Sequence, residues 1–272
     1  MGMINQLPRP ALFAHRGASH YSPENTLAAF ELAIKQQADA IELDVKATAD
    51  GHVVVIHDQT VDRTTNGTGN VADMELAQIQ ELDAGVHFEL QFAGEKVPTL
   101  REVLIQCAKR IPINIELTNY ASLFDSLPEK VAAIVREFSM EDFILFSSFN
   151  PIALLKIKRI LPKVPIALLC LSGKNGAIPR SRMINRFSHE AIHPEYTDVT
   201  QGLIRAAHKH NKRVHAYTVN QASDIQNMFN NGVDGIFTDD PVLAKQVLNQ
   251  QQQPNGPRYH YPLNPLSNTN IQ

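Results

Sequence analysis

The chain has 272 residues, 43% of them hydrophobic, and its formal net charge at pH 7 is −3. Such a composition can bury a sizeable core, and the lack of a basic excess argues against a general nucleic-acid or membrane-surface binder. No apolar run approaches the length of a bilayer span, and the first residues lack a basic stretch followed by an apolar segment. We therefore expect a cytoplasmic protein without stable membrane insertion, in which Cys107 and Cys170 are buried free thiols.

Two periodicities alternate along the chain. Apolar and β-branched runs predict strands, the first running from residue 11 to His15 and the others at residues 40–47, 53–58, 113–118, 143–149, 166–171, 191–195, 213–219 and 235–238. Helical spacing of apolar residues predicts helices at residues 24–37, 100–110, 129–138, 151–161, 179–187, 202–210, 222–230 and 241–248. An Asp50-Gly51 turn separates the second strand from the third.

This alternation predicts parallel βαβ units, and roughly eight strand–helix pairs fit a closed (β/α)8 TIM barrel, an α/β fold, better than an open doubly wound sheet. Residues 59–98 interrupt the alternation after the strand that ends near His57. Their Thr, Asn, Gly and Asp content predicts a small insertion over the barrel mouth. Residues 251–272 are rich in Gln, Asn and Pro, which predicts an irregular or disordered tail after a barrel at residues 1–250.

Several residues that carry chemistry stand at the ends of predicted strands in the first quarter of the chain, namely His15, Glu42, Asp44 and His57. Glu42 and Asp44 are two apart in one strand, so their carboxylates point to the same side. Glu116 interrupts a later apolar strand. In a barrel of parallel strands the carboxyl ends form the mouth, where catalysis occurs. We expect these side chains to meet there.

Three converging carboxylates without a cysteine make an oxygen-rich site that a cation must neutralise. Such ligands favour Mg²⁺ or Ca²⁺ over zinc, so we predict one divalent cation bound by Glu42, Asp44 and Glu116. Arg16 adds a planar donor suited to phosphate, and two histidines can supply a base and an acid near neutral pH. Cleavage of a phosphodiester needs these parts together.

Ordered sequence blocks add a family resemblance. The blocks are HRGA from His15, PENT at 23–26, the Glu-x-Asp pair, His57-Asp58, DRTTNGTG at 62–69, NIEL, SSFNP at 147–151, YTVN at 217–220 and GVDGIFTDDP at 232–241. From residue 11 to residue 248 the chain resembles the glycerophosphodiester phosphodiesterase family. The resemblance implies a TIM barrel with an insertion after the strand of the second histidine. It also implies metal-dependent hydrolysis of small glycerophosphodiesters to glycerol 3-phosphate and an alcohol.

Carried over by position, the resemblance gives each site residue a role. His15 and His57 are the acid–base pair, with the order of the two left open. The metal ligands are Glu42, Asp44 and Glu116, and Arg16 contacts the phosphate.

Two positions depart from the family pattern. The family usually has a lysine two residues after the third acidic ligand, where this chain has Thr118. Lys46 and Lys174 are the candidates to replace its charge. The family also often has a tryptophan where this chain has Tyr217, whose ring still offers a flat wall for the glycerol moiety. Tyr217 is therefore a second candidate substrate contact.

Other polar residues receive structural interpretations. Arg63 and Asn66 are expected to stabilise the insertion, and Asp239 and Asp240 to cap the last helix. Asp58 has two equal interpretations, orientation of the preceding histidine or capping of the next turn. The remaining histidines of interest are expected to have no direct role and to be surface or structural residues, namely His20, His87, His189, His193, His208, His210 and His215.

Two alternative functions stay open. A lysophospholipase D or related phosphodiester lyase needs an apolar groove at the mouth, for which Val86, Phe88, Leu90 and Phe92 are candidates, although a satellite core is the simpler interpretation. A phosphate-ligand binding barrel with weakened catalysis explains the absent lysine but not the paired proton-transfer groups. The alcohol headgroup, the choice of cation and the oligomeric state are left open.

Overall fold

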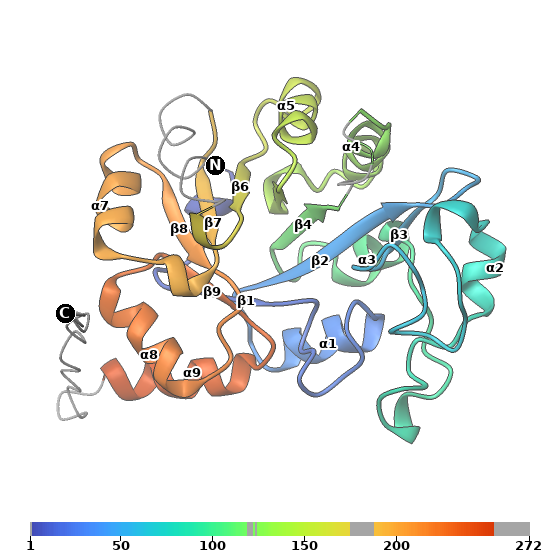
Figure 1. Cartoon of the computed structure of the whole chain (residues 1–272), viewed down its shortest axis with the longest axis horizontal. Coiled ribbons are helices and arrows are strands. Elements are labelled where there is room, and N and C mark those ends of the chain that lie inside the picture. The colour runs from blue at the N-terminus through green and yellow to red at the C-terminus, as the bar shows by residue number, and fades with distance from the viewer. Residues whose placement is uncertain (1, 119–121, 123, 175–187, 253–272) are drawn as a thin grey trace, which may run out of the picture.

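The computed structural model describes residues 2–118, 122, 124–174 and 188–252. Within them, eight parallel strands close into a barrel in the order β1-β2-β4-β5-β6-β7-β8-β9, because β1 pairs with both β2 and β9. The barrel strands are β1 (Ala11–Ala14), β2 (Ala40–Ala47), β4 (Ile113–Leu117), β5 (Ile144–Ser148), β6 (Ile166–Cys170), β7 (Ala191–Pro194), β8 (Arg213–Ala216) and β9 (Gly235–Thr238). Helices surround them (Figure 1), so the predicted (β/α)8 fold is confirmed.

Several helices begin where the sequence offers a capping side chain. The helices of the described residues are α1 (Leu27–Lys35), α2 (Leu76–Glu81), α3 (Leu100–Cys107), α4 (Leu127–Glu137), α5 (Pro151–Ile160), α7 (Gln201–Lys209), α8 (Ala222–Asn231) and α9 (Pro241–Gln252). The Thr26 hydroxyl accepts the N–H of Ala29 at the start of α1, which explains why this helix starts later than predicted. Thr99 and Glu102 form a reciprocal capping box at the start of α3.

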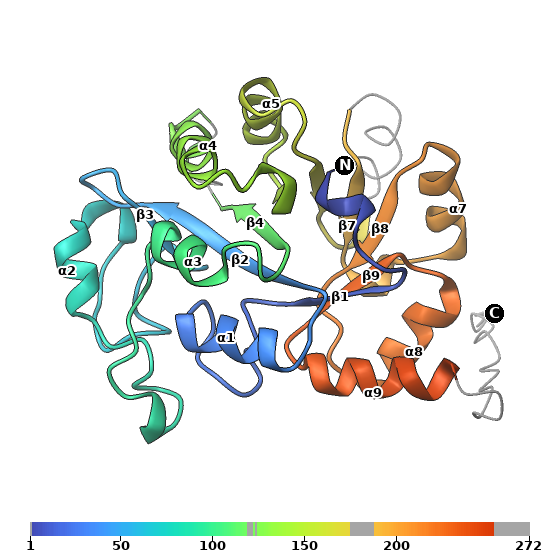
Figure 2. The ribbon, with the colours of Figure 1, turned by 180° about the vertical axis from the view of Figure 1, so that it is seen from behind.

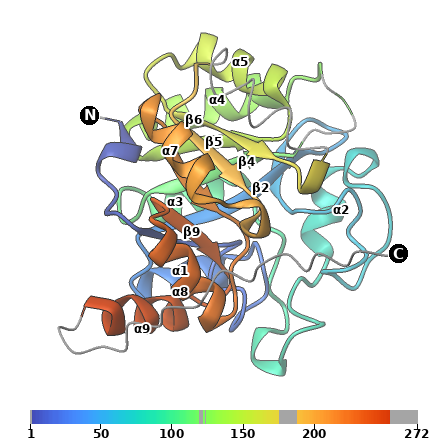
Figure 3. The same cartoon turned by 60° about the vertical axis from the view of Figure 1, so that its left-hand side comes forward.

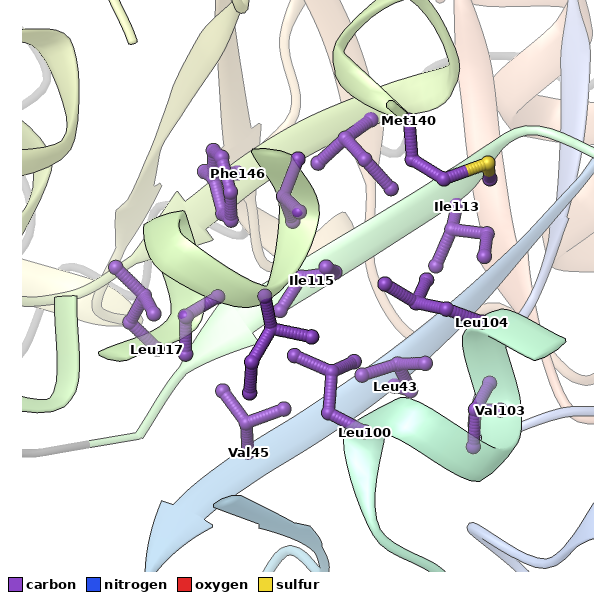
Figure 4. Close-up of a cluster of buried hydrophobic side chains, with 14 of the residues drawn as sticks. Leu43, Val45, Leu100, Val103, Leu104, Ile113, Ile115, Leu117, Met140 and Phe146 are labelled. Atoms are coloured by element: carbon purple, nitrogen blue, oxygen red, sulfur yellow. The ribbon is translucent and has the colours of Figure 1, made fainter. Parts of the chain in front are cut away.

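The largest apolar cluster lies between the barrel wall and the helices outside it (Figure 4). Alternate residues of β2 and β4 face outward into this cluster, namely Leu43, Val45, Ile113, Ile115 and Leu117. Leu100, Val103 and Leu104 of α3 pack against the same cluster. Because side chains alternate between the two faces of a strand, the acidic residues of β2 and β4 face the barrel interior.

The amino end of the barrel is closed by apolar side chains. Met3 and Ile4 of the 3-10 helix η1 (Met3–Asn5) pack with Leu7 against interior residues of the strands, including Phe13 and Leu145. Figure 2 shows η1 in front of the strands, on the side of the molecule that faces away in Figure 1. The polar interior residues are therefore reached from the carboxyl ends of the strands.

The structure differs from the prediction at residues 53–58. β3 (Val53–Val55) is shorter, pairs antiparallel with the end of β2 and lies outside the closed barrel. The short connection explains this, because a tight turn joins antiparallel neighbours whereas parallel strands need a long crossover. His57 is therefore not at the carboxyl end of a barrel strand. The hairpin returns it to the mouth, where the N–H of Ile56 donates to the carbonyl of Asp44.

Residues 59–98 lie beside β2 and β3, away from α8 and α9 (Figures 1 and 3). This insertion contains η2 (Val71–Asp73), α2 and η3 (Leu90–Phe92). It has a small apolar core of its own, made by Val54, Ile56, Val61, Val71, Ile79, Ala84 and Val97. The residues proposed for a satellite core do not build it, because Val86 and Phe88 are exposed and Leu90 is 96% exposed.

The C-terminal boundary also shifts. α9 extends past residue 248 to Gln252, so residues 251 and 252 are helical and not part of an irregular tail. The helix predicted at residues 179–187 and the tail from residue 253 lie outside the described residues. Among the helices of the described chain, none has the length and apolarity needed to cross a membrane.

Candidate active site

Three carboxylates converge on the inner wall of the barrel. Asp44 of β2 and Glu116 of β4 are paired in register, and Glu42 lies on the same face of β2. One oxygen from each of Glu42, Asp44 and Glu116 lies within 4.8 Å of the others. Burial, together with the charges of Asp44 and Glu116, raises the pKa of Glu42 well above its usual range.

The burial and the chemistry of these three carboxylates fit a bound cation. Glu42 is 2% exposed and Asp44 1% exposed, and the Oε1 atom of Glu42 is buried without a hydrogen-bond partner among the described residues. A buried carboxylate oxygen without a donor is costly unless a positive charge faces it. The donor set is all oxygen, which suits a hard divalent cation and not a thiolate metal.

Arg16 borders this cluster because the chain turns sharply after β1. Arg16 and Gly17 have positive φ angles of 56° and 85°, and a Cβ on Gly17 would lie 2.6 Å from the Cβ of Ala29, so only glycine fits there. The turn aims the N–H of Arg16 at Glu42 Oε2, at 2.9 Å. Burial alone would lower the pKa of Arg16, but the charges of Asp44, Glu24 and Glu42 raise it above its ordinary value.

His15 is held by a carboxylate that directly follows the last barrel strand. Its Nδ1 lies 2.7 Å from Asp239 Oδ1. Asp239 also accepts from Ser19 Oγ at 3.1 Å and from Asn220 Nδ2 at 2.5 Å. Although burial would raise its pKa, these hydrogen bonds lower the pKa of Asp239 below the usual aspartate value.

The predicted capping role is therefore wrong for Asp239. Its neighbour Asp240 does cap α9, because its Oδ1 accepts the N–H of Leu243 at 2.9 Å. No short-range pattern links Asp239 to a histidine 224 residues away; the closure of β9 against β1 does so.

His57 is held by its sequence neighbour. Its Nδ1 lies 2.6 Å from Asp58 Oδ1, which decides between the two interpretations of Asp58 in favour of orientation. Arg63 donates to both oxygens of Asp58, at 2.7 and 3.2 Å, and these hydrogen bonds are the main cause of the strongly lowered pKa of Asp58. Arg63 also donates to both oxygens of Glu24, at 2.7 and 2.8 Å, and Glu24 accepts from Arg16.

The role of Arg63 goes beyond the loop-stabilising one that the sequence predicts. It joins the insertion to the loop before α1 and holds the aspartate that orients His57. A motif that places an arginine five residues after a His-Asp pair could have signalled this contact.

A cavity of about 180 Å³ opens between these groups. His15, Arg16, Glu42, His57, Glu116 and Tyr217 line it, so the structure brings these six sequence-predicted residues together. Asp44 lies beside the cavity, where its carboxylate accepts from Asn25 at 3.0 Å. The ring of Tyr217 packs edge-to-face against Phe149, and its hydroxyl donates to the carbonyl of Cys170 at 2.8 Å.

The position of the absent family lysine is approached by another lysine. Lys46 Nζ donates to the hydroxyl of Thr118 at 2.9 Å and to its carbonyl at 3.0 Å. Lys46 shares the face of β2 that carries Glu42 and Asp44, and burial lowers its pKa. Lys174 is exposed.

The sequences of known proteins agree with this geometry. A sequence model of the glycerophosphoryl diester phosphodiesterase family matches residues 15–243. The chain is 42% identical over 231 residues to a glycerophosphodiester phosphodiesterase of Caldanaerobacter subterraneus subsp. tengcongensis, covering 85% of this chain and 94% of the relative. It is 36% identical over 250 residues to a glycerophosphodiester phosphodiesterase of Bacillus subtilis, covering 86% and 85%.

Solved structures give the same result. The phosphodiesterase of Oleispira antarctica, solved in complex with the product sn-glycerol-3-phosphate, superposes with a TM-score of 0.84 at 28% identity, covering 92% of this chain and all of that chain. The glycerophosphodiester phosphodiesterase of Agrobacterium tumefaciens gives 0.74 at 33% identity, covering 87% and 99%. The chain therefore belongs to the glycerophosphoryl diester phosphodiesterase family and is an enzyme, a glycerophosphodiester phosphodiesterase.

Proposed function

We propose that this enzyme hydrolyses small glycerophosphodiesters to glycerol 3-phosphate and an alcohol, with one divalent cation at Glu42, Asp44 and Glu116 and with His15 and His57 as the proton-transfer pair. The observation that carries the proposal is the convergence of three carboxylates and two aspartate-held histidines on one cavity. A phosphate-binding barrel would need no such paired histidines.

The cation site is supported by the unpartnered Oε1 atom of buried Glu42 and by the all-oxygen ligand set. Mg²⁺ and Ca²⁺ both suit these ligands. When bound there, a divalent cation neutralises charge on the phosphate and lowers the pKa of a nearby hydroxyl.

The two histidines are prepared for proton transfer by their aspartates. Because Nδ1 of each ring pairs with a carboxylate, the proton stays on Nδ1 and Nε2 is left to meet the substrate. One neutral histidine accepts on Nε2 the proton of the glycerol 2-hydroxyl as its oxygen attacks phosphorus and the bond from phosphorus to the alcohol oxygen breaks. The other histidine enters this step with a second proton, carried on Nε2, and gives it to the departing alcohol. The product of this step is a cyclic 1,2-phosphate.

Water then opens the cyclic phosphate with the proton roles reversed. The tethered hydroxyl is favoured as nucleophile over water because intramolecular attack gains a large effective concentration. Arg16 offers its planar guanidinium to the phosphate oxygens, and Lys46 supplies the second positive charge near Thr118.

The lysophospholipase alternative is less well supported. None of the described residues that line the cavity comes from the exposed apolar segment Val86–Phe92, so that segment offers no groove continuous with it. Most of the residues that line the cavity are polar or charged, which favours a water-soluble substrate.

The test is a product assay across glycerophosphodiesters and lysolipids, with and without a chelator. We expect glycerol 3-phosphate from the glycerophosphodiesters only, loss of turnover in the chelator and recovery with Mg²⁺ or Ca²⁺. Full activity in excess chelator after exhaustive dialysis would remove the cation from the proposal. Faster turnover of lysolipids would favour the alternative.

A further inference from the structure

The sequence block at residues 23–26 contains an acidic side chain, Glu24, to which the proposed chemistry gives no part. It belongs neither to the carboxylate cluster nor to the residues that line the cavity of about 180 Å³. The Glu24 side chain is nevertheless only 20% exposed. A charge that is mostly removed from water is costly unless it is paired, so the partners of Glu24 indicate what it does there.

The backbone around Glu24 is fixed on the wall of the site. Asn25 has a positive φ of 59°, and its N–H donates to the carbonyl of Arg16 at 2.9 Å. The Asn25 side chain donates from Nδ2 to Asp44 Oδ2 at 3.0 Å, and its Oδ1 accepts the N–H of Asp44 at 3.3 Å. The chain segment that carries Glu24 is therefore held against a proposed cation ligand and against the turn after β1.

Glu24 pairs with two arginines at once. Its Oε1 accepts from Arg16 Nη1 and from Arg63 Nη2, both at 2.8 Å, and its Oε2 accepts from Arg63 Nη1 at 2.7 Å. Arg16 comes from the barrel, whereas Arg63 comes from the insertion and also holds Asp58. Burial would raise the pKa of Glu24, but the hydrogen bonds from Arg63 and the charge of Arg16 lower it, so Glu24 is ionised near neutral pH.

The contact with Glu24 orients the guanidinium of Arg16. Nη1 is taken by Glu24, whereas Nη2 makes no hydrogen bond within the described residues and is left for a phosphate oxygen in the cavity that Arg16 lines. The Nε atom of Arg16 lies 3.3 Å from Asp44 Oδ2. Without Glu24, Asp44 would remain as a carboxylate within ion-pair distance, so the guanidinium would turn toward a proposed cation ligand and away from the phosphate.

We propose that Glu24 is a positioning residue that acts on two steps of the reaction through two arginines. The inference rests on the proposed function. Through Arg16, Glu24 presents a guanidinium to the substrate phosphate and so supports binding. Through Arg63, it supports Asp58 and with it the orientation of His57, which serves proton transfer. Glu24 itself touches neither the substrate nor the reacting atoms.

The test measures binding and turnover separately. Glu24→Gln keeps the volume of the side chain and removes its charge. Affinity for sn-glycerol 3-phosphate, measured by calorimetry on the cation-loaded enzyme, should fall about tenfold, as for other residues that orient a ligand. The kcat for a glycerophosphodiester should fall less, by about threefold, because Arg63 keeps its own contact with Asp58. Glu31→Gln is the matched control, because Glu31 accepts from Arg110 on both oxygens outside the cavity and should change neither quantity.

Double-variant cycles assign each loss to its route. In an Arg63→Gln background, Glu24→Gln should leave kcat nearly unchanged but should still lower the affinity for sn-glycerol 3-phosphate. In an Arg16→Gln background, Glu24→Gln should lower this affinity no further. A residue that only stabilised the fold would lower thermal stability, and its effects on binding and turnover would not depend on either arginine.

Unchanged affinity for sn-glycerol 3-phosphate in Glu24→Gln would overturn the inference, and so would equal losses of kcat in the wild-type and Arg63→Gln backgrounds. Glu24→Asp keeps the charge but withdraws the carboxylate by one carbon, so it replaces the glutamine variant if that one does not fold. Both losses should appear in Glu24→Asp, and their absence would overturn the inference as well. Because binding is measured without turnover, failure of the proposed function would appear separately, as absence of turnover in the wild-type enzyme.

Discussion

His15 and His57 are each held at Nδ1 by an aspartate, but the two aspartates are themselves held differently. Asp239 comes from the end of β9 and receives neutral donors, Asn220 and Ser19. Asp58 follows His57 directly and is held by Arg63, a charged side chain of the insertion that is 48% exposed. We call the His15–Asp239 pair the barrel arm, because the barrel strands position it. We call the His57–Asp58 pair the insertion arm, because Arg63 of the insertion holds its aspartate.

The two arms should therefore differ in how strongly salt affects them. Neutral hydrogen bonds among strand ends change little with salt, whereas an exposed ion pair is screened. Besides His15, the side chains that donate to Asp239 in the described part of the chain are neutral, whereas the negative charge of Asp58 is shared with the Arg63 guanidinium. We therefore expect the barrel arm to be more sensitive to loss of its aspartate.

The largest effect should come from loss of the proposed cation site. Asp44→Asn should lower the rate by about 10³-fold or more and weaken Mg²⁺ binding, with little change in thermal stability. Calorimetric Mg²⁺ titration and steady-state assays measure both quantities. Asp142→Asn, at an exposed site outside the cavity, is the control. Full activity of Asp44→Asn would mean that the arms work without this ligand.

Removing either histidine should have the next largest effect. His15→Ala and His57→Ala should each lower kcat about 10²–10⁴-fold, because each removes a general acid or base. If the arms act as a unit, the double variant should lose little more than the worse single one. His208, which pairs with Asp234 at 2.7 Å outside the cavity, provides a matched His208→Ala control. Near-wild-type kcat in both single variants would disprove the mechanism.

The aspartates test the comparison directly. Asp239→Asn should lower kcat about 100-fold and Asp58→Asn about tenfold, within the range known for residues that orient a ligand or base. The asymmetry follows from Arg63, which already offsets part of the Asp58 charge. Steady-state kinetics at one pH measure both. A larger loss in Asp58→Asn would reverse the proposed order of the arms.

Arg63→Gln should lower kcat roughly tenfold or less, because it acts through Asp58. In the Asp58→Asn background, Arg63→Gln should have almost no further effect. Arg110, which makes a two-pronged contact with Glu31 outside the cavity, gives the matched Arg110→Gln control. Additive losses from Arg63 and Asp58 would show that Arg63 acts on the site by another route.

The smallest effect concerns stability at acid pH. The pKa of Asp58 and the pKa of Asp239 are both lowered in the folded protein, so each carboxylate stabilises it above the ordinary pKa of about 3.9. This contribution is lost as pH falls through and below that value. Both side chains are about a third exposed, so each should contribute less than about 1 kcal/mol.

Urea unfolding of wild type, Asp58→Asn and Asp239→Asn between about pH 7 and pH 3 measures this. The stability difference from wild type should shrink as pH falls. At high salt this difference in unfolding free energy should shrink further for Asp58→Asn than for Asp239→Asn. The reason is that Asp58 forms an ion pair with Arg63, which salt screens. Equal salt dependence in the two variants would contradict the comparison.

Local sequence was sufficient for most of the fold. Strand and helix periodicities placed the elements of the barrel, and the two-residue spacing of Glu42 and Asp44 put both carboxylates on one wall. Strand positions, and then the family blocks, pointed to His15, His57 and Glu116 as candidate site residues, and all three line one cavity. The hairpin of β3 was missed as such, because a β-branched run does not say which neighbour it pairs with.

The partners of the site residues were decided only by the tertiary structure. Asp239 reaches His15 because the last strand closes the barrel against the first, and Arg63 reaches Glu24 across the mouth. Lys46 reaches Thr118 because β2 and β4 are neighbours. Periodicity fixes which face a side chain occupies, but closure of the barrel fixes which faces meet, and that depends on packing along the whole chain.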